Sequence, residues 1–247
     1  DFRATIQLIS LARPSIVECS AKVTYPDYLG LPSYQSESMA RSVSFPEGST
    51  VALQGRTDRG ISMMNAFVPT RSLDAEFTAN TFMIPLKDMK QEEEIAISFV
   101  DSYGLETNNE HTVRLLSLED SPPQADFKNL APESTILLLE TITLSIIAKD
   151  DLGLAQTRLK MKAKRGTDLL FDTTLYKQAE SENNVTQAGF SFPFDPTFFT
   201  LQDGDIAEFT AQAVDRLPGR EPTTSRTVRF LVVGPEKHAD IIRARME

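Results

Sequence analysis

Cysteine, histidine and tryptophan are scarce in this sequence: 247 residues contain one Cys, two His and no Trp. One cysteine excludes an intramolecular disulfide, and two histidines beside it leave too few ligands for the usual four-ligand Cys/His zinc site. No apolar run approaches the roughly 18–20 residues that a membrane-spanning helix needs. The 25 Lys and Arg residues face 35 Asp and Glu, a net charge of −10. This balance argues against a nucleic-acid partner, because such binding depends on clustered Lys and Arg.

The remaining composition is that of a globular protein, with 40% hydrophobic and 24% charged residues. At roughly 100–150 residues per domain, the length predicts two compact units. The chain starts without Met, in a strand-like segment, and closes on Pro235-Glu236, a pattern typical of a helix start. We therefore expect a piece of a longer protein.

One strand pattern recurs along the chain with a domain-sized spacing. Residues 5–11, 112–118 and 227–233 are β-type runs, and proline follows each of them within a few residues. Two further pairs of segments match in the same order, 95–101 with 209–215 and 51–58 with 144–151. A period of about 110 residues indicates tandem domains, since solenoid repeats are far shorter.

The repeat predicts four segments. Residues 1–12 are expected to form the last strand of a preceding repeat, 13–121 a first Ig-like sandwich, 122–234 a second one, and 235–247 the start of a helical region. Ser121-Pro122-Pro123 suits a short stiff linker, because proline fixes its own φ and restrains the residue before it.

Alternation of apolar and polar residues predicts the fold class. In residues 17–25 the odd positions are apolar and the even positions polar, as in a strand with one face on a core, and Cys19 falls on the inward side. Short strands with turn signals every 8–15 residues indicate an all-β chain: two tandem antiparallel Ig-like or fibronectin-like β-sandwiches with a short C-terminal helix start. Prolines 85 and 193 predict edge strands or strand ends, and the run 136–139 is expected in the core rather than in an exposed patch.

Several phrases resemble a known family. Residues 15–32, ending in Tyr25-Pro26-Asp27-Tyr28-Leu29-Gly30-Leu31-Pro32, are similar to the opening of Ig-like domains in large envelope proteins of planctomycete-type bacteria; residues 45–51 and 148–154 resemble later phrases of the same proteins. The resemblance implies membrane helices, tandem Ig-like domains and a C-terminal coiled coil, an extracytoplasmic location, and no known reaction. More loosely, residues 213–222 and 100–106 resemble the turn before the last strand of cadherin repeats. Residues 118–123, which stand where cadherins have their calcium-binding linker, match that linker poorly.

Carboxylates are the candidates for a site. Asp101, Glu119, Asp120 and Asp126 fall near the predicted domain junction, where acidic loops could supply the 6–8 oxygen ligands of calcium. The alternative is that they cap turns, since Asp accepts hydrogen bonds from nearby backbone N–H groups. For Asp150 and Asp151, before Leu152-Gly153, turn capping is the favoured interpretation over a ligand or general base.

The sequence predicts no catalytic residue and no other cofactor. Neither histidine has a Gly-x-Ser-x-Gly elbow, no phosphate-binding Gly-rich loop is present, and His111 is expected to face solvent. The aromatic loop 25–34 is expected to pack over a sandwich end rather than bind sugar.

We therefore expect a non-enzymatic spacer and protein-interaction module. Its partners would be other domains of the same longer chain and an unidentified protein, with membrane contact only through segments outside these residues. The alternative is a calcium-rigidified, cadherin-like adhesion module that binds a protein or glycan ligand at sandwich-end loops.

Overall fold

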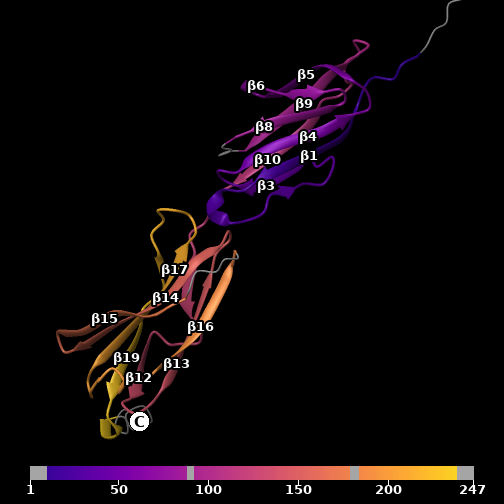
Figure 1. The fold of residues 1–247 in the computed structure, drawn as a ribbon. Coiled ribbons are helices and arrows are strands. Elements are labelled where there is room, and N and C mark those ends of the chain that lie inside the picture. The colour runs from indigo at the N-terminus through magenta and orange to yellow at the C-terminus, as the bar shows by residue number, and fades with distance from the viewer. Residues whose placement is uncertain (1–9, 88–91, 179–183, 238–247) are drawn as a thin grey trace, which may run out of the picture. The chain divides into compact units, whose positions relative to one another are not determined.

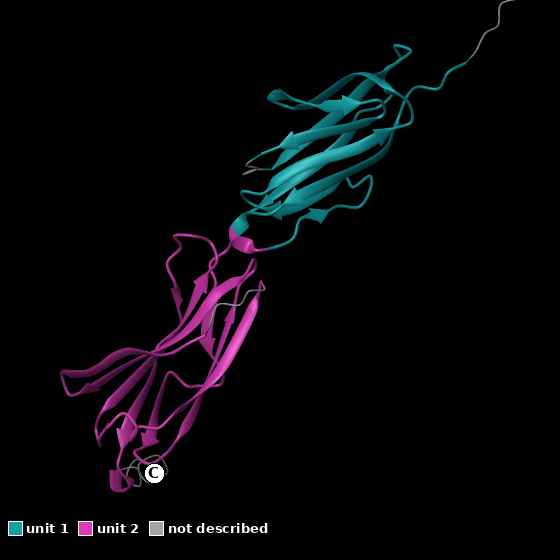
Figure 2. Cartoon of the chain, in the orientation of Figure 1, with its two compact units in different colours: residues 1–27, 31–119 teal, residues 28–30, 120–247 magenta. Residues whose placement is uncertain are grey.

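The computed structural model describes residues 10–87, 92–178 and 184–237. The chain divides into two compact units (Figure 2): unit 1 comprises residues 1–27 and 31–119, and unit 2 comprises residues 28–30 and 120–247. The division at Glu119 and Asp120 lies two residues before the expected junction, and the repeat pattern does not predict that residues 28–30 group with unit 2. Among the described residues no helix is long and apolar enough to cross a membrane.

Unit 1 is a sandwich of two five-stranded sheets, ordered β2-β1-β4-β8-β7 and β3-β10-β9-β5-β6. Its strands are β1 (Ile16–Thr24), β2 (Tyr34–Gln35), β3 (Ser42–Pro46), β4 (Thr50–Thr57), β5 (Ile61–Val68), β6 (Arg71–Leu73), β7 (Glu76–Thr78), β8 (Thr81–Leu86), β9 (Glu93–Asp101) and β10 (His111–Leu118). The short 3-10 helix η1 (Asp27–Leu29) follows β1 in the chain, and its residues 28 and 29 group with unit 2.

The core of unit 1 lies between the two sheets, because the strands alternate inward apolar and outward polar residues. Val23, Leu53 and Ile84 of one sheet and Ile97 of the other are fully buried in a single apolar cluster. Cys19 belongs to this cluster at 1% exposure, which confirms its predicted inward position. Burial raises the pKa of its thiol to about 11, as for an inert core cysteine.

Unit 2 has a three-stranded sheet, β11-β13-β16, facing a sheet ordered β12-β19-β17-β14-β15, with β18 paired to β17. Its strands are β11 (Gln124–Phe127), β12 (Glu133–Leu137), β13 (Ile142–Lys149), β14 (Leu154–Arg165), β15 (Asp168–Lys177), β16 (Gln187–Phe194), β17 (Ile206–Asp215), β18 (Thr223–Thr224) and β19 (Val228–Val233). Pro193 lies on β16, an edge strand as predicted, and Pro85 lies near the end of β8.

Aromatic side chains fill much of the unit 2 core. Phe209 of β17 packs edge-on against Phe194 of β16, with ring centroids 4.8 Å apart, and against Phe230 of β19 at 5.9 Å. These edge-to-face pairs add to the area that burial removes from water. The core draws its residues from 127 to 232, and that of unit 1 from 19 to 115, so each unit has a complete core of its own.

The matched sequence segments occupy equivalent strands. β4 and β13 each lie between a first strand and a later antiparallel neighbour, β9 and β17 are central strands of the second sheet, and β10 and β19 follow them. In both units the last strand also pairs in parallel with an early strand, β10 with β3 and β19 with β12 (Figure 1). This is the two-sheet arrangement of Ig-like domains, so the predicted tandem Ig-like fold is confirmed.

The predictions for the two chain ends and for the run 136–139 are tested only in part. Most of residues 1–12 and of 235–247 lie outside the described residues; 10–12 form no strand, and 235–237 are helical. The prediction of a core run at 136–139 is wrong in part. Ile136 is buried, whereas Leu139 is 82% exposed, because it follows β12 in the turn to β13.

Candidate functional site

A buried aspartate closes the β9 end of unit 1. Asp101 is fully buried, and its Oδ1 accepts hydrogen bonds from the N–H groups of Tyr103 and Leu105, both at 2.8 Å. Its Oδ2 lies 3.3 Å from Nη1 of Arg59, whose Nη2 reaches Asp58 at 3.2 Å. Asp101 therefore caps a turn and is paired with a guanidinium, the alternative that the sequence left open beside calcium.

Unit 2 repeats this device at the end of β17. Asp215 accepts a hydrogen bond from the N–H of Leu217 at 2.9 Å, and Nη1 of Arg220 lies 2.6 Å from its Oδ2. Arg220 reaches further, to Oδ1 of Asp120 at 3.3 Å and to the Asp120 carbonyl oxygen at 2.6 Å. One guanidinium thus serves two carboxylates that are 95 residues apart in the chain.

The turn after β13 brings two more aspartates. Oδ2 of Asp150 accepts from the N–H groups of Leu152 at 3.1 Å and Gly153 at 2.5 Å, and Oδ2 of Asp151 accepts from Ser121 at 3.3 Å. Gly153 has φ +138°, and a Cβ there would lie 1.8 Å from Oδ1 of Asn184, so the turn requires glycine. Both aspartates bind turn N–H groups, the role that their sequence position favours.

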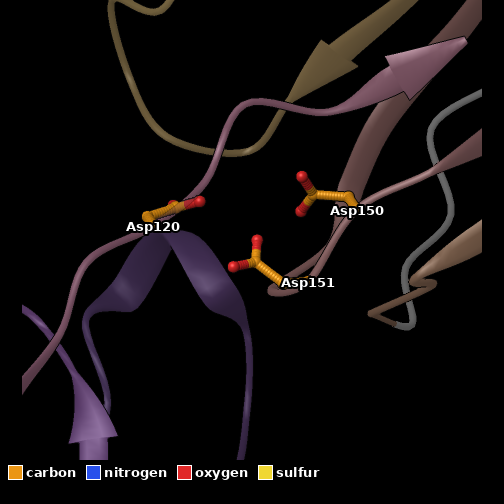
Figure 3. Close-up of side chains that lie close together, drawn as sticks. All are labelled: Asp120, Asp150 and Asp151. Atoms are coloured by element: carbon orange, nitrogen blue, oxygen red, sulfur yellow. The ribbon is translucent and has the colours of Figure 1, made fainter.

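Together these turns form an acidic cluster, which we define as Asp120, Asp150 and Asp151. One carboxylate oxygen from each lies within 4.8 Å of the others, and the carboxylates point toward one another (Figure 3). Oδ1 of Asp150 is buried and has no hydrogen-bond partner within the described part of the chain. In unit 1 the Ser15 N–H donates to Asp58 in the same way as Ser121 does to Asp151. Unit 1 lacks the other two carboxylates, since Thr57 replaces Asp150 and Pro14 replaces Asp120.

Burial and neighbouring charges disfavour the ionisation of two of the cluster's carboxyl groups, those of Asp120 and Asp150. Burial, then the charge of Asp215, raises the pKa of Asp120 to about 6 despite the opposing charge of Arg220. Burial likewise raises the pKa of Asp150, and Asp215 and Asp151 add to the effect. The hydroxyl of Tyr28, 3.4 Å from Oδ2 of Asp120, has its pKa raised to about 12 by burial and by that carboxylate.

Such a donor set suits a hard cation. Calcium takes carboxylate and carbonyl oxygens, and three carboxylates with one unpartnered buried oxygen supply part of its 6–8 ligands. Arg220 is the competing cation, since it already contacts Asp120 on two atoms. The arrangement can hold charge; it presents no nucleophile–base pair among the described residues of the cluster.

Of the four predicted calcium candidates, only Asp120 lies in this cluster. Asp101 belongs to unit 1, Glu119 is an exposed residue at the end of unit 1, and Asp126 is exposed and paired with Arg226 at 2.9 Å. The sequence offered no sign that the turn after β13 meets Asp120, because the two are 30 residues apart.

His111 corrects another expectation. It is half-buried rather than solvent-facing, and its Nε2 is buried with no hydrogen-bond partner in the described residues. Burial and the charge of Arg41 lower the pKa of its imidazole. A neutral, half-buried histidine at the start of β10 is a packing residue.

Neither the protein-family models nor the curated proteins contain a match to this chain. Solved structures that resemble it include the fibronectin(III)-like modules of Clostridium thermocellum CbhA (10% identity over 80% of this chain and 92% of that one, TM-score 0.29). The IG1+IG2 pair of DIP-gamma is also similar (9%, 90% and 98%, 0.32), as is a chimeric titin Z1Z2 tandem (13%, 77% and 94%, 0.27). Likeness this weak carries no argument about activity, and the strand topology alone establishes the fold.

Proposed function

We propose that this chain is a non-enzymatic structural spacer and protein-interaction module within a larger extracytoplasmic bacterial protein. Ig-like sandwiches serve as such modules in many cell-surface proteins. The observation that carries the proposal is the parallel pairing of an early strand with the last strand in both units.

This pairing suits a chain under tension. β3 and β10 share five residue pairs in register, as do β12 and β19. Each pair joins the strand near the entry of a unit to the strand at its exit, so tension along the chain shears all its hydrogen bonds together rather than opening them one by one. A spacer needs this resistance, whereas a binding domain held by one end does not.

Single-molecule stretching of the whole chain tests the proposal. We expect two separate unfolding events, each releasing about 35–40 nm, since roughly 110 residues extend at about 3.6 Å each. Hydrogen bonds from Arg229 to Pro132 and from Leu138 to Val233 set the alternation along β12, so Ser134 donates to β19. Ser134→Pro should lower the force of one event and leave the other as its internal control. A single event of double length, or extension at negligible force, would contradict the spacer role.

The extracytoplasmic location is proposed from the family resemblance of residues 15–32, 45–51 and 148–154. Fusion of alkaline phosphatase, which is active only after export, to the natural full-length protein after residue 247 tests it. Activity in intact cells is expected. An inactive fusion that is active when given a separate export signal would refute the location.

The acidic cluster favours a second candidate, a calcium-rigidified adhesion module. Burial, with the charges of neighbouring carboxylates, raises the pKa of Asp120 and of Asp150, and a divalent cation would favour their ionised forms. A ligand at 100 times its Kd stabilises the folded state by about 2.7 kcal/mol. Millimolar calcium should then raise the melting temperature at pH 7.5. Asp151→Asn should abolish the rise, and Asp172→Asn, an exposed β15 carboxylate, should preserve it. An unchanged melting temperature eliminates this candidate.

A further inference from the structure

An open groove of about 450 Å³ lies along β11 in unit 2. Its walls come from β11, from the end of β13 and from the segment that leads from β18 to β19. Gln124, Asp126, Lys149, Thr224 and Arg226 are among the lining residues.

In unit 1 the equivalent edge is covered by an extended segment. β1 corresponds to β11, since each pairs antiparallel with the matched strands β4 and β13. After β2, Ser36 donates its N–H to the Ala21 carbonyl at 2.8 Å and its Oγ accepts from the Ala21 N–H at 2.8 Å. Met39 N–H then donates to the Cys19 carbonyl at 2.6 Å. Residues 34–39 therefore form a strap along β1.

In unit 2 side chains replace only part of this strap. The register places Phe127 at the position of Ala21 and Ala125 at that of Cys19. Phe127 donates its N–H to Oδ1 of Asp126 at 2.8 Å, and its carbonyl accepts from Arg226 at 3.2 Å. Beyond this clamp, no hydrogen bond from outside the β11–β13 pair reaches Ala125 in the described residues. The edge is thus satisfied at one end of the groove and open at the other.

The charge of the groove indicates which side chains it would bind. Lys149 is exposed there and forms no ion pair within the described part of the chain, whereas Asp126 and Arg226 neutralise each other. The groove is therefore a cationic spot on a chain of net charge −10. In unit 1, the strap carries the acidic Glu37 just after the bonded Ser36.

We propose that the β11 groove receives an extended peptide strand from a partner protein, antiparallel to β11, with an acidic side chain directed at Lys149. Hydrogen bonds to the N–H and C=O of Ala125 contribute to the affinity, and the peptide side chain that enters the groove supplies the selectivity. This inference deepens the proposed interaction role by naming its surface and the chemistry of its partner.

A synthetic peptide of residues 33–40, the unit 1 strap with Glu37, is the probe. Fluorescence anisotropy with the labelled peptide should show saturable binding to the whole chain with Kd below about 1 mM. Amide shifts in NMR spectra should concentrate at β11 and at residues 223–226. Replacing Glu37 by Gln in the peptide should weaken binding about 2–5-fold, as expected for an exposed ion pair.

Two variants of the chain probe the groove by different means. Lys149→Glu should weaken binding at least about 5-fold by reversing the charge, and Thr224→Trp should abolish it by filling the groove. Lys177→Glu, at an exposed lysine of β15 outside the groove, should bind as the parent does. Absence of saturable binding, or binding that neither groove variant alters, would overturn the proposal. Neither of these results would change the two unfolding events expected in single-molecule stretching, so the spacer role is tested independently of the peptide site.

Discussion

Substitution of Asp120 by Asn should stabilise unit 2 at neutral pH. The Asp120 side chain is 6% exposed, and its pKa rises from 3.8 to about 6, chiefly through burial and the charge of Asp215. A group with a raised folded pKa binds its proton more tightly in the folded state. Its stabilising contribution is therefore complete below pH 3.8 and lost as pH rises through 6. Two units of pKa correspond to about 3 kcal/mol at most.

Urea denaturation monitored by the hydrogen exchange of peptides from β17 reports the unfolding of unit 2, and so measures how Asp120 changes its unfolding free energy with pH. Relative to Asp120→Asn, the parent chain should lose up to about 3 kcal/mol of unfolding free energy between pH 4 and pH 7, with no further loss above pH 7. Asp172→Asn controls for the change in net charge. If the Asn variant proved less stable than the parent at pH 7.5, or the difference were independent of pH, the account of a raised Asp120 pKa would fail.

Three further changes have defined outcomes. Asp205→Asn should lower the free energy of unfolding by about 2 kcal/mol at pH 7 and by less as pH falls. The reason is that the Arg165 guanidinium, at 2.8 and 2.9 Å, holds the pKa of that buried carboxyl below its usual range. Urea denaturation at pH 7 and pH 3 measures the loss at each pH, and an equal loss at both would refute this prediction. Gly153→Ala should lower the free energy of unfolding by about 1–3 kcal/mol, because of the positive φ and the contact of the new Cβ with Asn184. Gly166→Ala, with open space around it, is the control and should cost only its backbone strain. Equal melting temperatures for the two variants would refute the contact between residue 153 and Asn184. Phe209→Ala should cost about 3–5 kcal/mol, seen in calorimetry as a lower melting transition of unit 2, and a loss under 1 kcal/mol would contradict the packed core.

The fold was predictable because its determinants are local and repeated. Alternation in 17–25 marks a half-buried strand, and the recurrence of 51–58 and 95–101 in the second half fixes equivalent strands without any knowledge of contacts. The exposed Leu139 shows where this fails, since a run of like residues does not reveal where a strand ends.

The site was less accessible, because it is made by contacts between distant residues. Asp120 meets Arg220 across 100 residues and the turn of Asp150 and Asp151 across 30, and no local pattern encodes those meetings. Asp126 illustrates the same limit. By position it resembled a ligand, whereas in the fold it caps the β11 edge together with Arg226.

Native-state hydrogen exchange on two core variants tests most directly whether the chain is two self-contained copies of one sandwich. Leu53→Ala removes a fully buried side chain from the unit 1 core, and Leu159→Ala does the same in unit 2, each at a cost of about 2–5 kcal/mol. We predict that Leu53→Ala speeds exchange in β1–β10 alone and Leu159→Ala in β11–β19 alone. Equal loss of protection in both sets of strands from either substitution would show one shared core and contradict the account.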